Sequence, residues 1–147
     1  TIGMAKVAKS AHEAYDFNIL ERGKDIVVVS RDRQLAIAKE EAKVMAQNGY
    51  TQPVKTNNIK VLGRQALGAF LVGTDQMKAG KYISEHDQKI ANKLAYVMSG
   101  GDLSEANYVS EQYLLDLERE AFLSLCGERK TLERLQHMIK KGKPLRN

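Results

Sequence analysis

The chain has 147 residues, 43% of them hydrophobic, so it can bury a core of its own or form part of a larger domain. One cysteine excludes an internal disulfide and no apolar run is long enough to span a bilayer, which together indicate a cytoplasmic protein. The net charge of +5 permits a nucleic-acid partner without requiring one, because acidic residues are interspersed with the basic ones.

The first predicted element is a short helix over residues 11–17. Ser10 and Glu13 have the spacing of a capping box, in which the serine hydroxyl accepts a hydrogen bond from the backbone of the third helical residue. Asn18 follows, and asparagine tolerates the left-handed conformation that ends many helices.

A strand and a second helix are predicted next. Residues 25–30, DIVVVS, are the strongest strand signal in the chain because β-branched residues favour strands. Asp32 is the expected N-cap of a helix that ends at Gly49. A lone strand leaves its backbone groups without partners, so this pattern suggests that part of the protein lies outside the sequence.

Residues 50–62 are expected to be an irregular connector that precedes two helices. The first covers about residues 63–78. The second is capped by Ser84, with Asp87 at the box position, and it stops at Gly100 and Gly101.

Two further helices are predicted after a loop at residues 102–108. The first is a long amphipathic helix whose inward stripe is Leu114, Leu117, Ala121 and Leu125, with Gly127 just past its end. The last helix starts at Thr131 and stops at Gly142 and Pro144, with an inward face of Leu132, Leu135 and Met138 or Ile139. The fold class is therefore mainly α, with five or six helices and one short strand.

The sequence offers no catalytic centre and no metal site. None of its three histidines has a His or Cys partner at metal-ligand spacing, and the SEHD stretch at residues 84–87 fits a capped helix start better than a ligand cluster. Cys126 ends an apolar helix without a nearby histidine, which favours a structural cysteine over a nucleophile.

A basic cluster closes the chain. Lys140, Lys141, Lys143 and Arg146 follow one another closely, with Arg134 before them. Lysines at the end of a helix complement its dipole, so solvated side chains without a ligand remain one interpretation. The other is a phosphate-bearing partner. Nucleic acid is disfavoured because no aromatics are interleaved with the cluster, and a membrane surface because the apolar stripe is expected to pack inward.

Two stretches resemble the crotonase (enoyl-CoA hydratase/isomerase) superfamily. KSAHEAYDFNIL at residues 9–20 resembles its SA-x-E-A-x-x-x-G-L segment, with Asn18 in place of the usual glycine. YLLDLEREAFLSLCGERKTLERLQHMIKKGKPLRN at residues 113–147 resembles its C-terminal helices. ISEHD, LDLEREAF and GKPLRN are similar to one branch, the bacterial bifunctional 3-hydroxyacyl-CoA dehydrogenases with an enoyl-CoA hydratase region at the C-terminal end.

The resemblance implies a division of the chain and names what lies outside it. Residues 1–49 would be the end of the crotonase-like core and residues 50–147 a C-terminal helical region, both parts of one larger domain. The oxyanion hole, the catalytic glutamate pair and the NAD-binding domain would lie upstream, so this fragment would hold no cofactor and no catalytic residue. NAD and acyl-CoA would belong to the parent protein, an enzyme of fatty-acid β-oxidation.

The resemblance also implies a ligand for the basic cluster. In crotonase-like proteins the C-terminal helices cover the acyl-CoA site, at times from a neighbouring subunit, which implies a homo-oligomer. Carried onto this sequence, Lys140, Lys141 and Lys143 would approach the CoA phosphates, with Phe122 and Met138 as apolar neighbours of the acyl-CoA. The alternatives are a non-catalytic helical oligomerisation or binding module and, less favoured, a basic nucleic-acid-binding protein.

Overall fold

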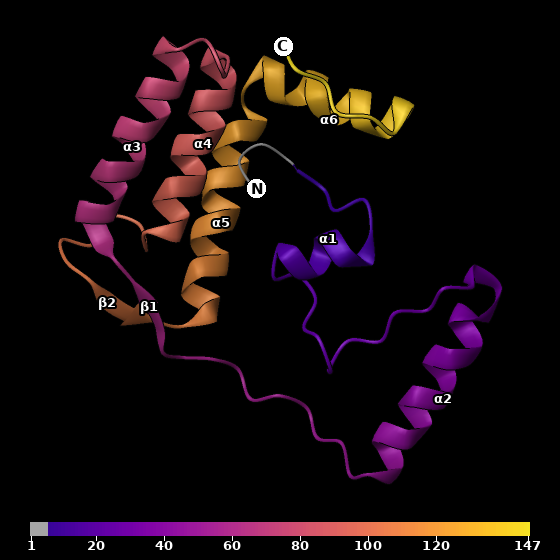
Figure 1. Ribbon diagram of the computed structural model, residues 1–147. Helices are drawn as coiled ribbons and strands as arrows, with labels where there is room; N and C mark the ends of the chain where they lie inside the picture. The colour runs from indigo at the N-terminus through magenta and orange to yellow at the C-terminus, as the bar shows by residue number, and fades with distance from the viewer. Residues whose placement is uncertain (1–5) are drawn as a thin grey trace. The chain divides into compact units, whose positions relative to one another are not determined.

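A computed structural model describes residues 6–147 of the chain. The chain divides into two compact units, Thr1–Val54 and Lys55–Asn147. In the described part, six α-helices and one two-stranded sheet make up the regular structure (Figure 1). The prediction of a mainly α protein is therefore confirmed.

The first helix, α1, covers Ala11–Asp16 and is capped as predicted. The Ser10 hydroxyl accepts a hydrogen bond from the Glu13 backbone N–H at 3.2 Å, and the Glu13 carboxylate accepts one from the Lys9 backbone N–H at 2.8 Å. Asn18 has a φ of 56°, which places it in the left-handed region expected from its sequence position.

The strand predicted over residues 25–30 is not formed, and this prediction is wrong. The segment is irregular, with Val29 99% exposed and Ile26 58% exposed. A turn precedes it, in which the Glu21 N–H donates to Asp25 Oδ2 at 2.6 Å. A β-branched run becomes a strand only when a second strand supplies hydrogen-bond partners, and this unit contains none among its described residues.

The helix α2 covers Gln34–Gln47 and begins one residue later than an N-cap at Asp32 would place it. Asp32 lies inside a short 3₁₀ helix, Arg31–Arg33, so its assignment as N-cap is wrong. Gly49 ends the segment with a φ of 75°, as expected. No residue of α2 is buried, and Ala14 is the buried hydrophobic residue of the described part of this unit.

The second unit contains the sheet, at two places where the sequence predicted irregular structure. The strand β1, Ile59–Val61, pairs antiparallel with β2, Asn107–Val109, so that Ile59 faces Val109. Strands of three residues are too short to show an alternation of apolar and polar positions. Val61 is only 2% exposed, and its side chain lies beside Gly100, which follows α4.

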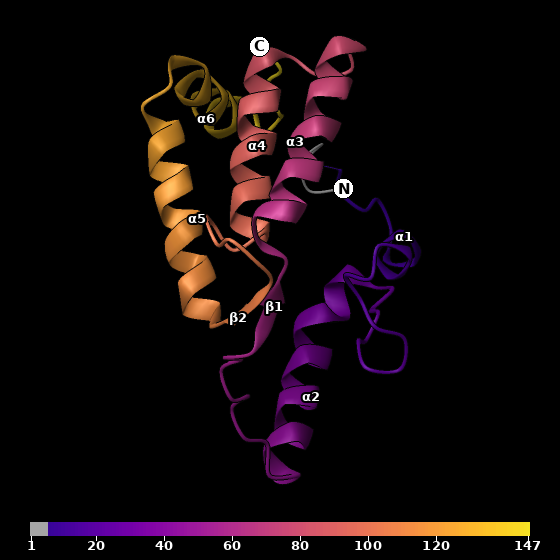
Figure 2. The ribbon, with the colours of Figure 1, turned by 90° about the vertical axis from the view of Figure 1, so that its left-hand side faces the viewer.

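Three helices lie side by side in this unit: α3 (Gly63–Ala79), α4 (Glu85–Met98) and α5 (Glu111–Cys126). The helix α4 lies between the other two and contacts both (Figures 1 and 2). Ala95 of α4 and Ala121 of α5 are buried. The three helices match their predicted ranges, since each has a clear apolar stripe and a stop or cap signal.

The last helix, α6, covers Arg129–Lys141 and ends at Gly142, whose φ is 65°. It begins two residues before the predicted start, so Thr131 lies inside the helix and is buried. The predicted inward face of α6 is wrong: Leu132, Met138 and Ile139 are 45%, 47% and 85% exposed. The polar side of α6 contacts α4 instead, because specific hydrogen bonds hold the two helices together there.

Candidate functional site

The start of α4 is a fully formed capping box. The Asp87 backbone N–H donates to Ser84 Oγ at 3.1 Å, and the Ser84 backbone N–H donates to Asp87 Oδ2 at 3.1 Å. The interpretation of SEHD as a capped helix start is therefore confirmed. Between residues 6 and 147, no group of three or more His, Cys, Asp or Glu side chains is placed to hold a metal ion.

Asp87 also binds α6. Arg134 Nη1 donates to Asp87 Oδ1 at 2.7 Å, and both side chains are largely shielded from solvent. Burial alone would raise the pKa of Asp87, but the hydrogen bonds from Arg134 and Ser84 outweigh it and lower the pKa to about 2. The carboxylate therefore stays ionised and holds the start of α4 against the middle of α6 at neutral pH.

His86 makes the second connection between α4 and α6. It is 4% exposed, and its Nε2 lies 3.0 Å from the hydroxyl of the buried Thr131. Burial lowers the pKa of His86, and the nearby Arg134 lowers it further. His86 is therefore neutral at physiological pH and acts as a structural contact.

The segment after α6 folds back onto the same contact. Arg134 Nε donates to the Asn147 carboxamide oxygen at 2.7 Å, and Asn147 Nδ2 donates to Glu133 Oε2 at 2.8 Å. Ser84 Oγ donates to the main-chain oxygen of Asn147 at 3.3 Å. Because the left-handed Gly142 reverses the chain, residues 142–147 are fastened to α6 and to the cap of α4.

These contacts hold the basic end of α6 at a defined place on the second unit. Lys140 and Lys141 lie in the last turn of α6, and Lys143 follows Gly142. All three side chains are exposed, and none forms an ion pair within the described residues. They are therefore available to a phosphate or carboxylate ligand, while they also offset the negative end of the helix dipole.

The two apolar candidates are exposed as well. Phe122 is 51% exposed on α5, and Met138 is 47% exposed on α6. Met138 shares α6 with Lys140 and Lys141, whereas Phe122 lies on α5.

Sequence reasoning missed the contacts that position this end of α6. The Ser84 cap was visible because capping joins residues three positions apart, whereas Asp87 and Arg134 are 47 positions apart. No periodicity connects residues at that separation. The sequence placed Arg134 next to the basic cluster, but it did not identify Asp87 as the partner of Arg134.

One comparison with known proteins gives a match. The chain is 52% identical over 147 residues to a protein of Bacillus subtilis (strain 168) named probable 3-hydroxyacyl-CoA dehydrogenase. The match covers 100% of this chain and 18% of that protein. No family model matches the chain. No solved structure matches it.

The similarity thus extends over every residue of this chain but spans less than a fifth of the relative. Where the structure describes the chain, no helix is both long enough and apolar enough to cross a bilayer.

Proposed function

We propose that this chain is a non-catalytic helical segment of a larger 3-hydroxyacyl-CoA dehydrogenase that acts in fatty-acid β-oxidation. The observation that carries this proposal is the 52% identity to the Bacillus protein, which is maintained over 100% of the chain. The absence of any recognisable catalytic arrangement in the sequence is consistent with a segment whose chemistry lies elsewhere in the parent protein.

We further propose that the parent carries a crotonase-like hydratase region to which this segment belongs. The support is the resemblance of residues 9–20 and 113–147 to that superfamily. NAD and the acyl-CoA substrate would then bind outside this segment. Assays of the full-length parent test both activities: it should reduce NAD with a 3-hydroxyacyl-CoA and hydrate a 2-enoyl-CoA. A parent without hydratase activity would contradict the second half of the proposal.

The first unit supports the idea of a missing neighbour. Val29 and Leu35 are 99% and 82% exposed, and α2 buries no residue. Apolar side chains on a helix and a β-branched run both need a partner surface to gain stability. In the parent, we propose that residues 25–30 pair with a strand outside this chain.

We propose that Lys140, Lys141 and Lys143 contact the phosphates of the acyl-CoA. The negative end of a helix dipole disfavours an anion, so a phosphate can bind there only if cationic side chains outweigh it. Three exposed lysines without ion pairs in the described part of the chain meet that requirement. Lysine contacts a phosphate as a point charge. Removing one such contact should cost about 1–2 kcal/mol of binding free energy.

The first test is Lys141→Glu in the full-length parent. We expect acyl-CoA affinity to fall about five- to thirtyfold, as a loss of about 1–2 kcal/mol requires. Affinity is measured by isothermal titration calorimetry at low ionic strength, and added salt should reduce the difference.

A matched control separates a specific contact from a change in net charge. Lys39→Glu makes the same charge change on the exposed surface of α2 and should leave the affinity unchanged. The affinity loss from Lys141→Glu should also shrink with a dephospho-CoA thioester, which lacks one phosphate. Equal affinities for the Lys141 and Lys39 variants would show that the lysines only stabilise the helix end.

A helical assembly module is the second candidate function. It is favoured by exposed apolar side chains on α5 and α6, among them Phe122, Leu123 and Ile139. Sedimentation of the 147-residue chain distinguishes the two ideas. The assembly module alone would be supported by two results together. The chain would self-associate in a way that Ile139→Asp abolishes, and the full-length parent would not bind acyl-CoA.

A further inference from the structure

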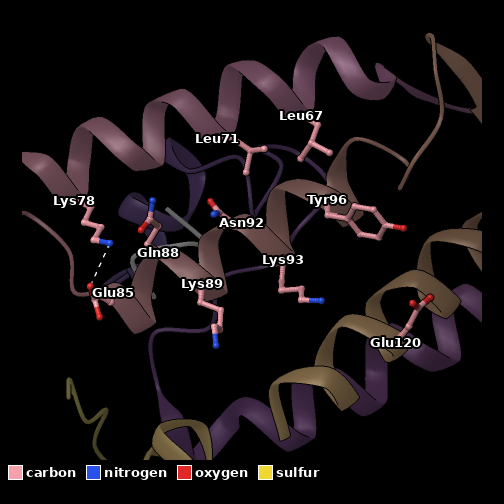
Figure 3. A pocket seen from close by; sticks show the side chains of 10 residues that line it. All are labelled: Leu67, Leu71, Lys78, Glu85, Gln88, Lys89, Asn92, Lys93, Tyr96 and Glu120. Carbon is pink, nitrogen blue, oxygen red and sulfur yellow. Dashed lines mark ion pairs between the residues drawn. The ribbon is translucent and has the colours of Figure 1, made fainter. Parts of the chain in front are cut away.

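A groove of about 590 Å³ follows α4 between α3 and α5 (Figure 3). This volume lies within the range of sites that hold small molecules. All of its lining residues belong to α3, α4 and α5, so it is separate from the basic end of α6. Its polar and apolar side chains are distributed unevenly, and that distribution indicates the kind of ligand it suits.

The α3 side of the groove is apolar. Leu67 and Leu71 lie one helical turn apart on α3 and both line the groove. Thr74 Oγ1 and Asn92 Oδ1, 2.6 Å apart, tie α3 to α4 beside them. This wall can cover an aliphatic chain of a few carbons.

The α4 side of the groove is polar. Lys93 and Tyr96 line the groove from α4. Figure 3 shows both side chains projecting from α4 on the side that faces α5. An occupant must therefore combine a short apolar part with a polar group that accepts hydrogen bonds.

One lysine of the groove can attract an anion. Two of the three lysines in the groove are already paired, Lys78 with Glu85 at 3.4 Å and Lys89 with Glu128 at 2.7 Å. Lys93 is half-buried and has no ion pair in the part of the chain that the structure describes. A partly desolvated ammonium without a carboxylate partner attracts an anion more strongly than a fully solvated one.

Tyr96 supplies a second donor. Burial raises the pKa of its hydroxyl, and the Glu120 carboxylate on α5 raises it further. The hydroxyl therefore remains protonated and can donate a hydrogen bond to an anion near Lys93. Glu120 itself lines the groove and opposes the binding of a negative group by charge repulsion.

We propose that this groove binds a small aliphatic carboxylate, with its carbon chain against Leu67 and Leu71 and its carboxylate beside Lys93 and Tyr96. The proposal does not depend on a CoA contact at α6. The groove would stay a carboxylate site even if the α6 lysines bound nothing.

Hexanoate is the probe, titrated into the ¹⁵N-labelled 147-residue chain and followed by amide chemical shifts. We expect saturable shifts in α3 and α4, with hexanamide, which lacks the charge, binding more weakly. Lys93→Gln should weaken hexanoate at least tenfold, as the loss of a charge-assisted hydrogen bond requires. Lys39→Gln makes the same charge change on α2 and should have no effect.

Two further variants keep the test decisive if Lys93→Gln disturbs the fold. Tyr96→Phe removes only the hydroxyl and should weaken hexanoate several-fold. Glu120→Gln removes the charge repulsion and should raise the affinity for hexanoate. The proposal is overturned by shifts that do not saturate, by equal hexanoate affinities for the Lys93 and Lys39 variants, or by weaker hexanoate binding to Glu120→Gln.

Discussion

His86 is a titratable residue enclosed between two helices. It contacts Thr131 of α6 and is surrounded by Arg134, Lys130 and Lys89, with Glu128 as the opposing charge. Protonation would place a further positive charge among three cations in a site with little solvent. The structure therefore requires the neutral imidazole.

This requirement predicts a pH dependence of stability. Because burial lowers the pKa of His86 in the folded chain, the unfolded chain binds more protons near the ordinary value of 6.5. The free energy of unfolding should be unaffected by His86 above that pH and should fall as the pH drops below it. Urea unfolding followed by circular dichroism, repeated between about pH 5 and pH 7, measures the slope.

His86→Gln removes the titration and keeps a polar side chain for Thr131, so its slope over this range should be smaller than that of the unaltered chain. His12→Gln is the control, since His12 is exposed. A slope that His86→Gln leaves unchanged would mean that other groups dominate the acid response.

At the scale of elements, the junction between β1 and α3 depends on Gly63. Its φ is 67°, and a Cβ there would lie 2.5 Å from the backbone oxygen of Glu105. The Gly63 N–H donates to the Ser99 backbone oxygen at 2.9 Å, which fixes the start of α3 against the end of α4. Only a residue without a side chain fits this crossing.

Two glycine substitutions in α3 should therefore act in opposite directions. Gly63→Ala should destabilise the chain by at least about 2 kcal/mol, from the left-handed backbone and the close contact together. Gly68 lies inside α3 with nothing within 4 Å of its Cβ position, so Gly68→Ala should stabilise by about 0.5–1 kcal/mol.

The midpoints of urea unfolding for the two variants provide the measurement. If both substitutions shifted the unfolding midpoint in the same direction, the conclusion that the packing requires glycine at position 63 would be contradicted. No local sequence pattern indicates this role of Gly63, because the approach of Glu105 comes from a loop 42 positions away.

The sequence predicted the helices more accurately than the strands, and the reason is physical. Helices α3, α4 and α5 are stabilised by hydrogen bonds within each segment, so stripes and caps located them. Strands require a distant partner, so residues 25–30 did not form one while the unremarkable residues 59–61 did. The inward face of α6 was wrong because polar contacts with α4 decided its orientation.

At the scale of the whole molecule, the boundary between the two units is a testable feature. Residues 51–58 have no regular secondary structure and are exposed, and Lys55 is the basic residue within them. We expect trypsin to cut first after Lys55, or in the irregular loop of the first unit, and to leave residues 56–147 as a resistant fragment. Mass spectrometry over a digestion time course identifies the products.

The resistant fragment should keep its helical circular dichroism, because α3, α4, α5 and α6 make their contacts within it. Equally early cleavage inside α3 or α5 would show that the second unit is not stable without the first. The urea-unfolded chain serves as the reference for cleavage at every accessible lysine and arginine.

The sequence by itself determined the mainly helical class, the capped starts of α1 and α4 and the cationic end of α6, since each depends on residues within a few positions of one another. Only the tertiary structure decided that Asp87 and His86 bind α6, that the apolar side of α6 stays exposed, and that Lys93 and Tyr96 share a groove with two leucines of α3. Those features join residues far apart in the chain, and the packing of whole helices, which no local pattern encodes, brings them together.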